Sequence, residues 1–389
     1  GGFWNLTNNP FAIGTGPNSS NNTLTVSGGV VSNINAGVSI GVTNGANFNS
    51  LIVTSGGRLM AVESAAATEF LVGSGPGGGG GGGNNTVTLT NSTVTSFSFA
   101  GRGAVWIGSG SSNNTVTIAD TIWNTAQNGA SAPNEVKFTI GYGAAVSNVF
   151  HVSGGRVSAG DQNGNDLFIG ATAGSISNMM SVDRGGLVSN FNGFVVGGAP
   201  GANYNSLIIA DGSRLISYGA SSGFQVGCSN AAGIQGGGNN TAFLSNSVLL
   251  TAGASFVGSG SSNNTLSLLG NTRASLGAVT VGYVAASNNA LIVDNSVFTN
   301  TSLTIGNGFT NHGNSMIVTG PGRLAVNGAT VVGAGGSTNN TLSIDGGTPG
   351  GMYVTNTTTL TVGDARSGLN TLTLLNASMT VGSAVTVGG

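Results

Sequence analysis

The sequence has very little charge. Asp, Glu, Lys and Arg make up only 5% of its 389 residues, the formal net charge is −2, and Lys137 is the only lysine. A surface so poor in cations has little attraction for nucleic acid phosphates or anionic lipid head groups. No apolar run is long enough to span a bilayer. We therefore expect neither a nucleic-acid partner nor membrane insertion.

Cysteine is almost absent as well. Cys228 stands alone, which excludes a disulfide within the chain and leaves open a bridge to a second copy. Its place directly after Gly227 is typical of a small residue at a strand end. The scarcity of cysteine and lysine favours an extracellular or cell-surface protein over a cytosolic enzyme. The sequence has neither an initiator Met nor a signal peptide, which we interpret as a mature or excerpted chain.

Helical periodicity is also missing, and short alternating segments stand in its place. Thirteen times an asparagine precedes an apolar-x-apolar pair such as Leu24/Val26, as at the start of a period-2 strand. These asparagines are Asn22, Asn49, Asn85, Asn114, Asn148, Asn178, Asn205, Asn240, Asn264, Asn289, Asn314, Asn340 and Asn370. A second set of short strands ends in glycine, at Gly14, Gly41, Gly73, Gly108, Gly141, Gly170, Gly197, Gly227, Gly258, Gly282, Gly306, Gly333 and Gly363, and Gly388 continues the series.

The spacing of these glycines predicts the fold class. From Gly14 to Gly388 they enclose thirteen repeats of about 29 residues, a period typical of solenoids and propellers. A propeller blade needs four strands in about 40 residues, whereas this repeat has two clear strands and a weaker third near pairs such as Arg58-Leu59. We predict an all-β fold, a single elongated parallel β-solenoid of about 13 coils with an asparagine ladder and glycine corners.

The repeat runs through the whole sequence without a linker or a change in composition. We therefore expect one continuous domain over residues 1–389, with Gly-rich loops that bulge near residues 75–83 and 231–238. At roughly 4.8 Å per coil, thirteen coils would stack into a rod about 62 Å long.

The two periodic residue types have separate expected roles. Each asparagine amide is expected to hydrogen-bond to the next coil, and asparagine also tolerates the left-handed backbone of a corner. Each glycine is expected at a corner where φ is positive and a Cβ has no room.

Candidate catalytic and metal-binding groups are scattered. The eleven acidic residues are Glu63, Glu69, Asp120, Glu135, Asp161, Asp166, Asp183, Asp211, Asp294, Asp345 and Asp364, and they share no register. His151 takes an outward strand position, and His312 lies in a loop several coils away. Metal ions and acid–base catalysis need converging side chains. We expect no catalytic residues, no cofactor, no metal and no enzyme activity.

Other polar patterns lie on the expected surface. Arg58, Arg156, Arg214 and Arg323 share one register in glycine-containing turns, and we interpret them as turn residues that cover the edge of the core. A strip for carbohydrate or phosphate is the alternative. Pairs such as Thr115/Thr117 resemble the ice-binding face of some solenoid antifreeze proteins, although apolar residues interrupt the array.

Twelve Asn-x-Ser/Thr sequons occur, and six of them immediately precede a ladder asparagine. These candidate glycan sites are Asn21, Asn84, Asn113, Asn239, Asn263 and Asn339. An inward ladder residue would leave its predecessor facing solvent, where a glycan could attach. Turn chemistry followed by a β-forming threonine explains the same Asn-Asn-Thr pattern.

The repeat has a recognisable form: a strand ending in glycine, a Gly/Ser loop, Asn-x-Leu-x-apolar and Gly-Gly-x-apolar, best seen in residues 105–118. In this it resembles the bacterial β-strand repeats of autotransporter passengers and PEP-CTERM-associated surface proteins. The resemblance implies an exported structural protein and carries over no catalytic residue.

The first and last coils show no protective cap, although open β-edges invite pairing. We therefore predict an extracellular structural protein that assembles with itself, head to tail, into a filament or matrix fibre. The alternative is a cell-surface adhesin or passenger stalk that binds glycans or host proteins, with Trp106, Phe168 and Tyr204 as exposed aromatic contacts. An ice-binding solenoid is a more remote alternative.

Overall fold

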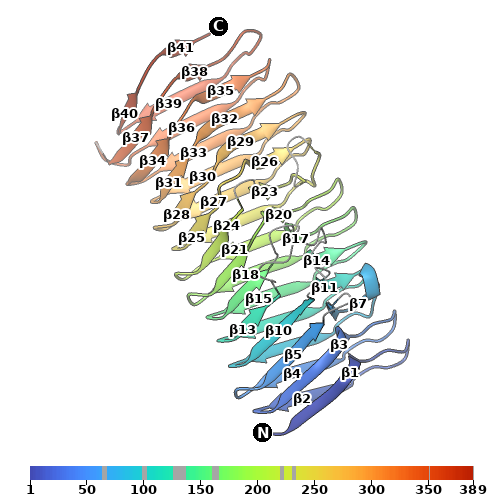
Figure 1. Ribbon diagram of the computed structural model, residues 1–389. Helices are drawn as coiled ribbons and strands as arrows, with labels where there is room; N and C mark the ends of the chain where they lie inside the picture. The colour runs from blue at the N-terminus through green and yellow to red at the C-terminus, as the bar shows by residue number, and fades with distance from the viewer. Residues whose placement is uncertain are drawn as a thin grey trace. The chain divides into compact units, whose positions relative to one another are not determined.

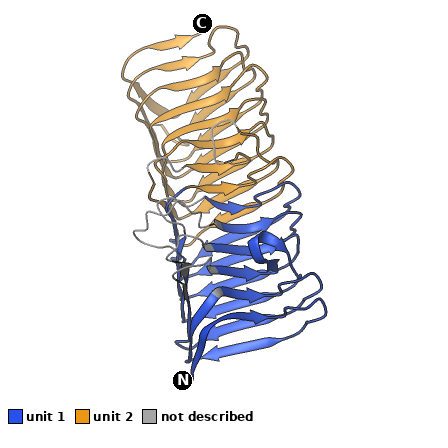
Figure 2. Ribbon diagram, turned by 45° about the vertical axis from the view of Figure 1, so that its right-hand side comes forward, with its two compact units in different colours: residues 1–192, 212–216 blue, residues 193–211, 217–389 orange. Residues whose placement is uncertain are grey.

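The computed structural model describes residues 1–63, 68–98, 103–125, 137–159, 166–219, 223–229, 234–349 and 351–388. It is an all-β parallel β-solenoid, so the predicted fold class is confirmed (Figure 1). Internal contacts divide the chain into two compact units, residues 1–192 with 212–216 and residues 193–211 with 217–389 (Figure 2). Each unit is described by itself. Asp161, Glu135 and residues 231–233 of the second predicted bulge lie outside the described residues.

Each coil has three strands, and equivalent strands of successive coils form three faces. We call the face that follows the ladder asparagines the asparagine face. The second face comes next along the chain, and the third face ends at the corner glycines. The weaker third strand of the sequence pattern is therefore a regular element of the coil.

The first unit contains six strands of the asparagine face. They are β2 (Thr23–Ser27), β4 (Ser50–Thr54), β9 (Thr86–Thr90), β12 (Thr115–Ala119), β15 (Val149–Ser153) and β18 (Met179–Asp183). The second face has β5 (Arg58–Glu63), β10 (Thr93–Ser98), β13 (Ile122–Asn124), β16 (Arg156–Ala159), β19 (Leu187–Asn190) and the start of β22 (Arg214–Ser217). The third face has β6 (Thr68–Val72), β11 (Gly103–Ser109), β14 (Lys137–Tyr142) and β17 (Leu167–Ile169). β1 (Phe3–Ile13) and β3 (Val30–Ile40) run along both of these faces.

The second unit repeats the same plan. Its asparagine face has β21 (Ser206–Ile209), β24 (Thr241–Ser245), β27 (Thr265–Leu269), β30 (Ala290–Asp294), β33 (Ser315–Thr319), β36 (Thr341–Asp345) and β39 (Thr371–Leu375). Its second face has β25 (Val248–Leu250), β28 (Arg273–Ser275), β31 (Val297–Asn300), β34 (Gly322–Val326), β37 (Met352–Asn356) and β40 (Ala377–Val381). Its third face has β20 (Phe194–Val196), β23 (Phe224–Val226), β26 (Ser255–Ser259), β29 (Ala278–Tyr283), β32 (Ser302–Asn307), β35 (Thr330–Ala334), β38 (Leu360–Val362) and β41 (Val385–Val387).

Neighbouring strands pair in parallel and keep the repeat in phase. Val116 of β12 lies beside Val87 of β9 and Phe150 of β15, and all three side chains are buried. The apolar-x-apolar pairs therefore stack as inward columns, while the residue between them faces outward. Burial of one such side chain stabilises the fold by roughly 1.5–3 kcal/mol, and most of that burial is against adjacent coils.

The core of the first unit contains an aromatic cluster. Trp123 lies between Phe70, Phe138 and Phe150, with ring centroids 4.7, 5.9 and 6.0 Å away. Its indole N–H donates to the Ser96 hydroxyl at 2.9 Å, so the one polar atom of the ring is satisfied inside the core.

The Gly-rich segment 75–83 bulges at the corner before Asn85, as predicted. It contains the short antiparallel pair β7 (Ser74–Gly75) and β8 (Gly79–Gly80) around the one-turn helix η1 (Pro76–Gly78). The Glu69 carboxylate accepts a hydrogen bond from the Gly77 N–H at 3.1 Å, and burial raises the pKa of this carboxyl above its ordinary value. The loop returns to register at Gly82, whose N–H donates to the Gly41 carbonyl.

Candidate functional site

The predicted ladder asparagines form one continuous hydrogen-bonded column within each unit. The N–H and the Nδ2 of each asparagine both donate to the Oδ1 of the next, as from Asn114 to Asn148 at 3.0 Å for both bonds. Asn22, Asn49, Asn85, Asn114, Asn148 and Asn178 belong to the first unit, and Asn205, Asn240, Asn264, Asn289, Asn314, Asn340 and Asn370 belong to the second. All are buried except Asn22 and Asn370 in the outermost coils.

Each corner glycine leaves a space over its Cα for the amide of a ladder asparagine. We call this space the seat of the asparagine. All thirteen have positive φ, between 61° and 81°. For eleven of them, an added Cβ would lie only 2.1–2.3 Å from the amide of an asparagine one coil further on, as at Gly108 over Asn148. These eleven are Gly14, Gly41, Gly73, Gly108, Gly141, Gly197, Gly227, Gly258, Gly282, Gly306 and Gly333. Gly170 shares the positive φ, and Gly363 has an open seat. Glycine is thus required both by the backbone and by the close approach of the asparagine.

The left-handed corner residue is not the ladder asparagine itself, contrary to our expectation. The residue before it has positive φ in all thirteen coils, from 54° to 64°. These residues are Asn21, Phe48, Asn84, Asn113, Ser147, Ser177, Tyr204, Asn239, Asn263, Asn288, Gly313, Asn339 and Leu369. Asparagine is the commonest because its short polar side chain tolerates this region. The Asn-Asn doublets therefore have a backbone origin.

Phe48 is one of the bulky exceptions in this column. Its φ is 58° and its ring is 56% exposed, so little packing offsets the strain. We expect Phe48→Asn to raise the free energy of unfolding by about 1 kcal/mol, measured by urea titration. Phe48→Ala removes the ring but keeps a strained L-residue, so it should give no such gain. Equal stabilisation by both variants would contradict the backbone explanation.

The six candidate glycan asparagines all occupy this left-handed position. Asn21, Asn113, Asn263 and Asn339 are exposed, and Asn84 and Asn239 are half-buried. The threonine two residues later points outward on the asparagine face in each case, as Thr115 does beside Thr86. The side chains of Asn263 and Asn239 contact each other at 3.3 Å.

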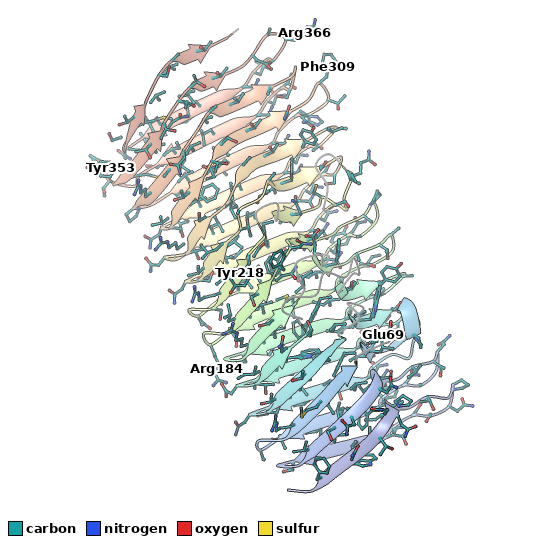
Figure 3. All side chains as sticks on the ribbon, in the orientation of Figure 1. Glu69, Arg184, Tyr218, Phe309, Tyr353 and Arg366 are labelled. Carbon is teal, nitrogen blue, oxygen red and sulfur yellow. The ribbon has the colours of Figure 1, made fainter. Side chains whose placement is uncertain are left out.

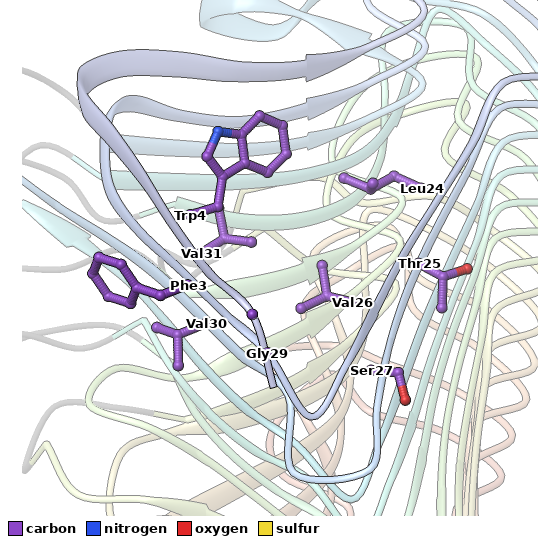
Figure 4. A pocket seen from close by; sticks show the side chains of 10 residues that line it. Phe3, Trp4, Leu24, Thr25, Val26, Ser27, Gly29, Val30 and Val31 are labelled. Carbon is purple, nitrogen blue, oxygen red and sulfur yellow. The ribbon is translucent and has the colours of Figure 1, made fainter.

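The first coil leaves part of its core open. Trp4 lies beside buried Val31 in the parallel register, yet its ring is 50% exposed. Together with Leu24 and Val26 it surrounds a hollow of about 250 Å³ at the end of the first unit (Figure 4). Among the described residues, no donor contacts the Oδ1 of Asn22, although every later ladder residue of the first unit accepts at this atom.

The last coil is open in a complementary way. Leu374, Val385 and Val387 are exposed, whereas equivalent residues one coil earlier, such as Ile344 and Val362, are buried. The Nδ2 of Asn370 donates back to the Ser337 carbonyl, but its backbone N–H has no acceptor among the described residues. Gly363 keeps a φ of 74°, and no described atom lies within 4 Å of the position that its Cβ would take.

The two histidines belong to different units. His312 is an exposed loop residue, whereas His151 is half-buried on the asparagine face. Its Nδ1 lies 2.7 Å from the Ser181 hydroxyl, and its Nε2 lies 3.7 Å from Oδ2 of Asp183. The second distance exceeds that of a hydrogen bond, so the three groups do not form a hydrogen-bonded relay. This cluster could not be predicted from the sequence because it depends on the register between two coils.

Metal-binding and reactive groups are few in the part of the chain that the structure describes. No three His, Cys, Asp or Glu side chains converge there on a position for a metal ion. Cys228 is buried, and the loss of hydration raises the pKa of its thiol to about 12. A neutral thiol is a poor nucleophile. Of the three aromatics predicted as exposed contacts, Tyr204 is exposed and Phe168 half-buried, but Trp106 is buried and makes an edge-to-face contact with Tyr142.

Two further polar features were not predicted from the sequence. Asn300 and Asn356 are buried at the ends of β31 and β37, and the Asn356 amide donates to the Thr330 hydroxyl at 2.8 Å. Arg273 belongs to the same column as Arg323, because both lie beside Val297. It was missed because the residues before it are Asn271-Thr272 rather than a glycine turn.

These features define the chain as a repeat protein of the β-solenoid class, held together by an internal asparagine ladder. No family model, curated protein or solved structure matches the chain. Among the described residues, no helix is long and apolar enough to cross a membrane.

Proposed function

We propose that this protein is an extracellular structural protein whose copies join head to tail into a filament. The observation that carries the proposal is the match between the two outermost coils. Gly363 leaves an empty seat for a ladder asparagine, and Asn370 offers an unpaired N–H. Asn22 offers a free Oδ1 and has no corner glycine over it among the described residues. Asn22 of one copy in the Gly363 seat of another would repeat the contact that eleven corner glycines make with an asparagine one coil further on.

The apolar surfaces of these coils support the same contact. Trp4 and Leu24 of the first coil and Leu374, Val385 and Val387 of the last belong to inward columns that are buried in internal coils. Stacking one coil on the other would remove this surface from water and pair the outer edges of β2 and β39, each of which has one strand neighbour. Such a contact joins different surfaces of two copies and therefore propagates.

Composition supports the extracellular role. One buried thiol leaves little chemistry that needs a reducing compartment, and the scattered acids and histidines support a structural role without catalysis. This role agrees with the resemblance of the repeat to bacterial surface proteins.

The proposal is tested by blocking the empty seat. Gly363→Asn keeps a residue that tolerates positive φ but fills the space that Asn22 would occupy, so we expect filament length to fall to short oligomers. Electron microscopy and sedimentation at equal concentration measure the effect. Wild-type fibres should diffract at roughly 4.7–4.8 Å along their axis.

The matched control is Gly212→Asn, at an exposed glycine with φ of 77° and, as at Gly363, no described atom within 4 Å of its Cβ position. It should leave assembly unchanged. A wild-type chain that stays monomeric at high concentration, or equal loss of assembly in both variants, would refute head-to-tail joining. The first result would instead fit further coils of the same polypeptide covering these ends.

A further inference from the structure

The strongest unexplained feature is the placement of arginine. The sequence has eight arginines, and five of them occupy one position of the coil, the first outward residue of the second face. Arg58, Arg156 and Arg214 belong to the first unit, and Arg273 and Arg323 belong to the second. We call these residues the arginine column. Because the chain has so few charges, this concentration of arginine at one position indicates a surface with a function beyond solubility.

The register of the column is set by backbone hydrogen bonds. Each arginine N–H donates to the residue that precedes its equivalent one coil earlier, as from Arg156 to the Thr121 carbonyl and from Arg323 to the Ser296 carbonyl. In the second unit the column reads Val248, Arg273, Val297, Arg323 and Tyr353 through consecutive pairings. In this unit arginine therefore recurs on alternate coils, roughly 9.4–9.8 Å apart, with an apolar residue between.

Three apolar members of the column are exposed like the arginines, whereas Val30, Leu187 and Val248 are half-buried. Tyr353 is 65% exposed and projects from the second unit in Figure 3. Val297 is exposed there, and Ile122 beside Arg156 is exposed in the first unit. All five arginines are exposed. Within each unit, arginine and apolar side chains therefore alternate over three successive coils, as in Arg156, Leu187 and Arg214. Arg58 stands outside this alternation, because Thr93 and Ile122 come between it and Arg156.

Among the described residues, none of the five arginines lies within salt-bridge distance of a carboxylate. Nearby acids are held on the asparagine face: Asp294 accepts from the Thr319 hydroxyl at 2.7 Å, and Asp345 accepts from the Asn376 amide at 3.1 Å. Asp120 pairs with Arg184 instead. Among the described residues, Asp211, in the corner before Arg214, has no such hydrogen-bond or ion-pair partner.

We propose that the arginine column binds an extended acidic polysaccharide. Guanidinium groups recognise carboxylates or sulfates in a bidentate manner, and the faces of sugar rings pack against aromatic and aliphatic side chains. A polymer with one anionic sugar alternating with one less charged sugar would match alternating cationic and apolar contacts. Nucleic acid carries charge far more densely than this column and would leave most phosphates unpaired.

The test uses the whole chain and hyaluronan, which has one carboxylate for every two sugars, with dextran as the neutral polymer. We expect hyaluronan binding that weakens with salt, and no dextran binding. The double variant Arg156→Gln, Arg323→Gln should weaken hyaluronan binding by about tenfold or more. The matched control is Arg184→Gln, Arg366→Gln, which removes the same charge outside the column (Figure 3) and should change affinity less than about twofold.

Three results would overturn the proposal: no hyaluronan binding by the wild-type chain, equal losses in the two double variants, or tighter binding of single-stranded DNA than of hyaluronan. Circular dichroism of both variants shows whether the β-structure is intact. Filament length measured in the same samples separates this proposal from head-to-tail assembly, which does not involve the arginine column.

Discussion

Asn289→Asp is expected to lower the free energy of unfolding by about 3–5 kcal/mol at pH 7. The change replaces one NH2 group by oxygen in a fully buried side chain. The Nδ2 of Asn289 donates at 3.0 Å both to Oδ1 of Asn314 and to the Ser261 carbonyl. A carboxylate would place negative charge against these two acceptors. Its own Oδ1 could still accept from Asn264, so the loss arises on one side of the ladder only.

The loss of unfolding free energy caused by Asn289→Asp is expected to depend on pH. Burial against acceptors favours the protonated acid, so the pKa of the introduced carboxyl would be higher in the folded than in the unfolded state. The folded protein then binds more protons, and the penalty grows as pH rises above the unfolded value of about 3.9. Urea titrations at pH 4 and pH 7 should show a smaller loss at pH 4, where a protonated carboxyl can donate to Asn314.

A control for Asn289→Asp lies one residue earlier. Asn288 is exposed, and aspartate tolerates its φ of 54° almost as well as asparagine does. Asn288→Asp adds the same charge and should change stability by no more than about 0.5 kcal/mol. If the two variants unfold alike at pH 7, the buried ladder does not stabilise the fold as described.

The ladder and its corners follow from sequence because two residue types recur with a fixed relation to the strands. Stacking in phase then makes each column continuous. The contact between Gly306 and Asn340 was harder to predict from the sequence, because the spacing of the residues alone does not show that a glycine of one coil covers the asparagine of the next. The left-handed position before each ladder asparagine was hard to predict because several residue types occupy it. Phe48, Tyr204 and Leu369 are not residues typical of turns.

The surface features were harder to predict for a related reason. Outward residues are not constrained to one chemical type by packing, so their columns emerge only from the exact register between coils. His151 meets Ser181 because Thr117, His151 and Ser181 occupy one outward row. Arg273 joins the arginine column through its pairing with Val297, although its turn differs from the glycine turns of the other arginines. A change in coil length leaves such rows intact only when it falls in a corner loop.

Gly306→Ala should be among the most destabilising single-methyl additions in this chain. The φ of Gly306 is 72°, which costs an L-residue about 1–2 kcal/mol. The new methyl would also lie 2.3 Å from the amide of Asn340, and the ladder must shift to make room. We expect a total loss of about 3–5 kcal/mol in urea titration. Faster hydrogen exchange is expected at the Asn314 N–H, which donates to Asn340 Oδ1 at 3.2 Å.

Gly212→Ala separates the two causes of this loss. Gly212 has a φ of 77° and no atom within 4 Å of its Cβ position, so it carries the backbone strain without the contact. We expect Gly212→Ala to lower the free energy of unfolding by only about 1–2 kcal/mol. The difference between the two variants then measures how closely the asparagine ladder must approach the corner. Equal losses would mean that glycine is selected for its backbone alone, and the open Gly363 seat would no longer support end-to-end joining through Asn22.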